Sequence, residues 1–153
     1  EHLRWGEVQA LNEPVQPRRE KASSHLVTGV VLRAFAAHPD YCKNPDIACA
    51  GELLASRIFK ADNYTDRKAP DYWTRITFPF WFTDLLSTLD SLSKIGFSSN
   101  QPNIREGIEW FVKQQKVDGS WSLHTLKGGG DTNYKYWIAL VICRMLDRFA
   151  KLD

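Results

Sequence analysis

The stretch that decides the fold is GIEWFVKQQKVDGSW, from Gly107 to Trp121. Apolar residues recur three and four places apart over 102–115, while charged residues occupy the other positions, which predicts an amphipathic helix. Gln115 ends that helix, where its amide can satisfy a free terminal carbonyl or the free N–H groups of the next helix. Gly119 supplies the turn, and Trp121 can fold its ring back over the amide. We therefore expect Gln115, Gly119 and Trp121 to form a structural staple.

The same helical period recurs in other parts of the chain, so the sequence predicts an all-α fold with about five main helices. Asn44 before Pro45 suits a helix cap followed by proline at the first helical position, and Gly96 is placed to end the third helix. Residues 1–22 contain two prolines and no apolar period, and are predicted to be an extended lead-in to a repeat domain at 23–153. The expected helices cover 24–37, 46–59, 79–95, 102–115 and 132–149.

A shift of the chain by 57 residues places Pro45 on Pro102 and Ile47 on Ile104, and it superimposes the helix pairs. A self-similar unit of two helices is typical of an array of α-hairpins. The units would span about 24–64, 79–121 and 132–150, the last without its outer helix. The first, third and fifth helices carry few charges, which favours an inner layer covered by an outer one.

The stretch 107–121 resembles the QW motif of squalene and terpene cyclases, in which a small residue, an aromatic residue, a Gln and Gly-x-Trp follow at set spacings. A larger part of the chain resembles prenyltransferase and squalene-oxidase repeat proteins, and the resembling stretches are 53–59, 77–81 with Asp84, 89–90, 118–121 and 136–137. This resemblance implies α-hairpin repeats of the α/α-toroid type, with the chain forming about half a toroid. It also implies an apolar ligand of isoprenoid type.

The known catalytic patterns of those families are absent from the sequence. Class II terpene cyclases use an Asp-rich motif as a strong acid, and protein prenyltransferases hold zinc with Asp, Cys and His. We therefore expect no metal and no cofactor. The one catalytic candidate is Asp84, since a carboxyl among apolar side chains can have a raised pKa and act as an acid. The alternative is that Asp84 caps its helix or hydrogen-bonds a neighbouring hairpin through Arg57 or Arg75.

Aromatic residues gather before the third and fifth expected helices, where the related cyclases line their cavities. They can bind an apolar ligand, and the alternative is that they pack in the core. The candidate ligand-binding residues are Trp73, Phe80, Trp81, Tyr134 and Trp137. His25 and His124 are expected to be capping or surface residues.

Three functions remain open from the sequence. The first is an isoprenoid- or lipid-binding toroid segment without a catalytic motif. The second is part of a cyclase-like or prenyltransferase-like enzyme whose catalytic acid lies outside this segment. The third is a helical-repeat scaffold for protein partners. Charge and hydropathy argue against two other classes of protein. A net charge of +2 with interspersed signs argues against a nucleic-acid-binding protein. No apolar stretch approaches the ~20 residues of a transmembrane helix.

The cysteines of the chain bear on its cellular compartment, and its last helix bears on which partners it has. Cys42, Cys49 and Cys143 are too few and too irregularly spaced for a disulfide framework, which favours the cytoplasm. Apolar residues surround the helix at 132–149, so one packed face would not cover them all. We expect this end to be covered by a second copy in a homodimer, by a missing portion of the same protein, or by the lead-in 1–22.

Overall fold

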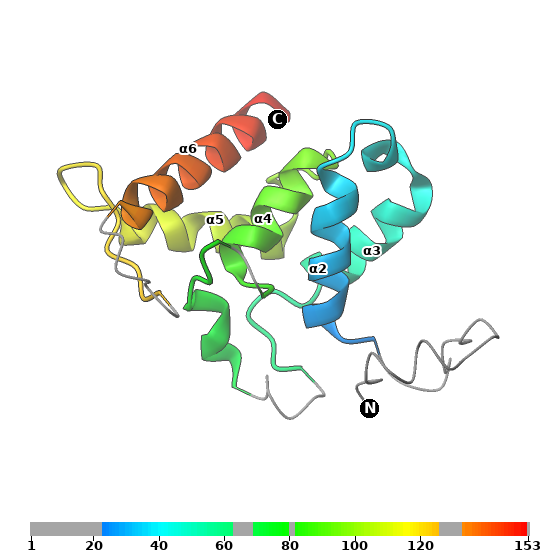
Figure 1. Cartoon of the computed structure of the whole chain (residues 1–153), viewed down its shortest axis with the longest axis horizontal. Helices are drawn as coiled ribbons and strands as arrows, with labels where there is room; N and C mark the ends of the chain where they lie inside the picture. Colours follow the sequence, from blue (N-terminus) through cyan, green and yellow to red (C-terminus); the bar gives the residue numbers. More distant parts are fainter. Residues whose placement is uncertain (1–22, 63–68, 80–81, 126–132, 153) are drawn as a thin grey trace.

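The computed structural model describes residues 23–62, 69–79, 82–125 and 133–152, and the fold there is all-α (Figure 1). Within these ranges five α-helices and two short 3-10 helices follow one another without a β-strand. They are α2 (His25–Ala36), η1 (Tyr41–Lys43), α3 (Pro45–Ala55), η3 (Pro70–Thr74), α4 (Leu85–Lys94), α5 (Pro102–Gln114) and α6 (Tyr134–Leu152). The predicted all-α class is confirmed for these residues, and the α/α-toroid arrangement stays a prediction. The lead-in 1–22, Phe80 and Trp81 lie outside the described residues.

Helix α4 is the centre of the fold, because α2, α3, α5 and α6 all pack against it. Its four leucines, Leu85, Leu86, Leu89 and Leu92, are fully buried. Helices α2, α4 and α6 lie in a row, while α3 packs against α2 and α5 against α4 (Figure 1). The described chain is therefore two successive helical hairpins, α2 with α3 and α4 with α5, followed by α6.

Helix α2 approaches the beginning of α4 closely at Gly29. A Cβ atom at this position would lie 2.3 Å from the Thr83 hydroxyl, so only glycine fits without a shift of its neighbours. The Thr83 hydroxyl in turn donates a hydrogen bond of 2.6 Å to the carbonyl of Leu26. These contacts hold the segment that enters α4 against the first half of α2.

Helix α4 begins at Leu85, so the prediction that the third helix starts at residue 79 is wrong. Asp84 has extended backbone geometry and caps the helix in a capping box with Ser87. The cap begins the helix here although apolar residues precede it. The other end was predicted correctly: Gly96 has a φ of +85°, and the N–H of Phe97 donates to the carbonyl of Leu92 at 3.1 Å, as in a Schellman motif.

Helix α3 begins as predicted and ends four residues early. The Asn44 side chain accepts a hydrogen bond of 2.9 Å from the N–H of Asp46, and Pro45 is the first helical residue. The helix ends at Ala55, although Ile58 in the following turn is still buried. The apolar period therefore continued past the helix because the turn also faces the core.

Helix α6 buries one face and exposes another. Its buried residues recur at helical spacing and face the core that α4 shares: Ile138, Ile142, Met145 and Phe149. Trp137 remains 55% exposed, and Tyr136 beside it is also exposed. One packed face covers those four residues and leaves Trp137 exposed, as expected. That a second copy, a missing portion of the protein or the lead-in covers this end stays a prediction.

The helices and the cysteines of the described residues were also predicted to have particular properties. None of their helices has the length and apolar character needed to cross a membrane. The three cysteines form no disulfide, and Cys49 and Cys143 are exposed.

Candidate binding site

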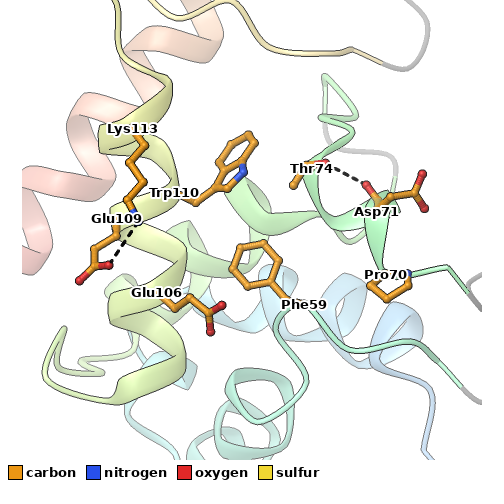
Figure 2. A pocket seen from close by; sticks show the side chains of 8 residues that line it. All are labelled: Phe59, Pro70, Asp71, Thr74, Glu106, Glu109, Trp110 and Lys113. Carbon is orange, nitrogen blue, oxygen red and sulfur yellow. Dashed lines mark hydrogen bonds and ion pairs between the residues drawn. The ribbon is translucent and has the colours of Figure 1, made fainter.

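A pocket of about 400 Å³ lies between α5, η3 and the turn that follows α3 (Figure 2). Its wall is more apolar than polar. The volume falls within the range of small-molecule sites. The residues that line it are Phe59, Pro70, Asp71, Thr74, Glu106, Glu109, Trp110 and Lys113.

Two aromatic rings, those of Phe59 and Trp110, occupy the middle of this pocket between α5 and η3 (Figure 2). Trp110 is oriented by its neighbour Phe111, which is fully buried and meets the indole edge to face at 5.0 Å. Both Phe59 and Trp110 are partly buried against the core. They therefore present part of each ring to the pocket while the rest is fixed by packing.

The turn that carries Phe59 is held by the residues on either side of it. Phe59 has a φ of +58°, a backbone region that bulky side chains rarely adopt. Ile58 before it is buried, and the carbonyl of Lys60 after it accepts a hydrogen bond of 2.9 Å from the Trp73 indole. Such strained geometry persists only where the surroundings enforce it, and it often occurs at functional sites.

The carboxylates of the pocket differ in their partners. Asp71 pairs with Arg75, and Glu109 lies 3.9 Å from the Lys113 ammonium, on the side of α5 turned away from the rings (Figure 2). Glu106 extends toward Phe59, and within the described part of the chain it forms no hydrogen bond or ion pair of its own (Figure 2). Glu106 is thus the carboxylate that is free to interact with a ligand beside the rings.

Asp84, the predicted catalytic candidate, lies in the core at 0% exposure and away from this pocket. One carboxylate oxygen accepts from the N–H of Ser87 at 2.7 Å, and the other accepts from the N–H and the hydroxyl of Thr77 at 2.7 and 2.9 Å. Its partners are therefore Ser87 and Thr77 in place of Arg57 or Arg75. Burial raises the pKa of Asp84, and the hydrogen bonds from Ser87 and Thr77 oppose that rise.

The structure describes three of the five aromatic residues predicted to bind a ligand, and none of these three lines the pocket. Trp73 is fully buried and supports the Phe59 turn from inside, so it does not line a surface. Tyr134 is partly buried against the core, and Trp137 is exposed on α6. Phe80 and Trp81 are among the residues that the structure leaves undescribed.

The structure brings Gln115, Gly119 and Trp121 together in one turn, with hydrogen bonds that differ from those expected. The Trp121 indole, rather than the Gln115 amide, satisfies a terminal carbonyl of α5, donating to Phe111 at 2.9 Å. The Gln115 amide donates to the carbonyl of Gly119 at 3.1 Å. Gly119 has a φ of +80°, which explains the glycine.

A second polar cluster lies under the beginning of α2. His25 is 1% exposed, so the expectation that it caps a helix or lies on the surface is wrong. Its Nε2 atom hydrogen-bonds with the Tyr72 hydroxyl and lies 3.5 Å from a carboxylate oxygen of Asp62. The Ser24 hydroxyl donates to the same oxygen at 2.9 Å. This cluster joins α2 to Asp62 and Tyr72, which lie on either side of the undescribed residues 63–68.

Sequence reasoning missed the pocket, although one of its residues carried a signal. Trp110 stands off the apolar stripe of its helix, and a large aromatic residue in that position indicates either a second packing face or a binding surface. Phe59 gave no such signal because it was predicted to lie within a helix.

Comparisons with family models, curated proteins and solved structures gave no match for this chain. The described residues also contain no group of three His, Cys, Asp or Glu side chains arranged to hold a metal ion.

Proposed function

We propose that this chain is a ligand-binding segment of the α/α-toroid type, and that its pocket between α5 and η3 receives an apolar group of isoprenoid or other lipid type. The observation that carries the proposal is the pair of partly exposed rings, Phe59 and Trp110, inside a pocket of about 400 Å³. Contact with such rings is the main source of affinity for an apolar ligand. The row formed by α2, α4 and α6 agrees with a repeat of the toroid kind.

Binding is favoured over catalysis because of the position of Asp84. Both of its carboxylate oxygens accept hydrogen bonds inside the core, and its side chain does not reach the pocket. A general acid must come within hydrogen-bond reach of the group it protonates. If the full protein is a cyclase-like or prenyltransferase-like enzyme, we expect its acid to come from another segment.

A scaffold for protein partners is the second candidate, and an exposed apolar stripe on α2 favours it. Val27, Val31 and Phe35 recur at helical spacing on this stripe, and Val27 is 60% exposed. Exposed apolar patches of this kind often mark interaction surfaces. The stripe lies on a different helix from the pocket, so the two functions can be tested separately.

Calorimetric titration with geraniol, a short isoprenoid alcohol, tests the proposed function. Trp110→Ala should weaken binding by about tenfold or more, since part of a large ring is lost from the contact. Trp137→Ala is the matched control, because this tryptophan is also exposed but lies on α6 outside the pocket. Absence of saturable binding to the unchanged chain, or equal weakening by both substitutions, would contradict the proposal.

A further inference from the structure

The pocket between α5 and η3 combines aromatic faces with one carboxylate, that of Glu106, which has no ion-pair partner among the described residues, whereas Asp71 pairs with Arg75 and Glu109 with Lys113. Three carboxylates and one ammonium line it: Asp71, Glu106, Glu109 and Lys113. The Lys113 ammonium lies 3.9 Å from the Glu109 carboxylate, on the side of α5 away from the rings (Figure 2). The space beside Phe59 is therefore left with the Glu106 carboxylate and without a neighbouring cation among the lining residues.

This combination discriminates between ligands by charge. The face of an aromatic ring attracts a cation, most strongly in tryptophan, and a nearby carboxylate adds to that attraction. A phosphate or diphosphate group beside the rings would instead be repelled by the Glu106 carboxylate. A neutral apolar group would gain contact with the rings but would make no use of Glu106.

We propose that the ligand of this pocket is an amphiphilic organic ammonium, with an apolar chain and a substituted ammonium group seated between Phe59, Trp110 and Glu106. This inference rests on the proposed function, since it assumes that the pocket binds an apolar ligand at all. Substituted ammonium groups are weakly hydrated, and recognition of such groups by aromatic side chains is a known use of the cation–π interaction. The Glu106 carboxylate supplies the opposite charge.

The three side chains proposed to contact the ligand border the same space. Glu106 and Trp110 are four residues apart on one helix and so lie on the same face. Phe59 reaches the same space from the turn after α3, which the hydrogen bond from Trp73 to Lys60 holds in place. A ligand in this space would therefore contact both α5 and the turn after α3, and no change of the backbone would be needed.

The test compares two probes that share one chain and differ in charge, geraniol and geranyltrimethylammonium, by calorimetry at physiological salt. The cationic probe should bind about tenfold more tightly, as expected when a cation–π contact and an ion pair act together. Glu106→Gln should remove most of that preference. Asp147→Asn is the matched control, since this exposed carboxylate is likewise paired with a lysine, Lys151, but lies on α6 outside the pocket.

The outcomes separate this inference from the proposed function. Equal affinity for the two probes, or an equal effect of Glu106→Gln and Asp147→Asn, would overturn the ammonium proposal and leave apolar binding standing. Failure of both probes to bind would overturn the proposed function and this inference with it. If Trp110→Ala leaves the cationic preference unchanged, the preference comes from surface charge alone and the proposal is wrong.

Discussion

Asp84 and Asp118 make the same kind of hydrogen bonds in opposite surroundings. Asp84 accepts from backbone N–H groups and a hydroxyl at the start of α4, at 0% exposure. Asp118 accepts from the N–H and hydroxyl of Ser120 in the turn after α5, at 3.0 and 2.7 Å, and is exposed. The two regions thus differ in solvent access and share their local chemistry.

The difference shows that burial decides the direction of the pKa shift. Hydrogen bonds from Ser120 lower the pKa of Asp118, where there is little desolvation to oppose them. Burial raises the pKa of Asp84 in spite of several hydrogen bonds that act the other way. A buried carboxyl with a raised pKa matches the pattern of a catalytic acid, yet here the same pattern accompanies a helix cap.

The largest effect is expected from Asp84→Ala. The substitution removes the cap of α4 and leaves the buried N–H of Thr77 without its acceptor. We expect the free energy of unfolding to fall by about 2 to 4 kcal/mol. Urea denaturation followed by circular dichroism measures this loss. A loss below about 1 kcal/mol would show that the cap contributes less than its burial suggests.

The pH dependence of the same site sharpens the comparison. Because its pKa is raised in the folded state, Asp84 keeps its proton there at pH values where the unfolded chain, with a value near 3.8, has lost it. The folded state binds more protons in this window, so stability rises as the pH falls through it. The free energy of unfolding of the unchanged chain, relative to that of Asp84→Asn, should therefore rise as the pH falls toward the unfolded value near 3.8.

An intermediate effect is expected from Trp121→Ala. The ring is partly buried against the core, and its indole satisfies a carbonyl of Phe111 near the end of α5. We expect a loss of about 2 to 3 kcal/mol, less than for a fully buried tryptophan. Trp121→Phe keeps most of the ring and removes the N–H, so it should cost about 1 kcal/mol. A melting temperature unchanged by Trp121→Ala would contradict the staple.

The helices could be predicted from the sequence because each depends on its own residues. The period of apolar side chains, Asn44 with Pro45, and Gly96 gave most of the boundaries. The start of α4 was missed because aromatic residues before Asp84 extend the apolar pattern into the preceding segment. The capping box of Asp84 with Ser87 was present in the sequence as a competing signal.

The candidate site could not be predicted in the same way, because it depends on contacts between distant segments. Phe59, Pro70 and Trp110 meet only after the hairpins have packed. Trp73 was recognised as a residue of interest, but whether its ring faces a ligand or the core depends on the path of the chain around it. The sequence therefore did not single out Phe59 and Trp110, the two aromatic residues that line the pocket.

The smallest effect is expected at the exposed member of the pair, through Ser120→Ala. This change removes the hydroxyl that donates to Asp118 at 2.7 Å and keeps the backbone N–H. The pKa of Asp118, which is held below its usual 3.8, should move back toward that value. Carboxyl chemical shifts followed by NMR through an acid titration measure the change directly.

The sign of the stability effect at Asp118 is opposite to that at Asp84. A carboxyl whose pKa is lowered by folding stabilises the protein above its unfolded pKa, and that contribution is lost as the pH falls through the folded value. The stability difference between the unchanged chain and Ser120→Ala should therefore be small at neutral pH and vanish in acid. The stability of the unchanged chain relative to Asp84→Asn should instead rise as the pH falls toward 3.8 and change no further below that value, where the Asp118 contribution is lost. If both differences changed in the same direction, burial would not be what distinguishes the two carboxylates.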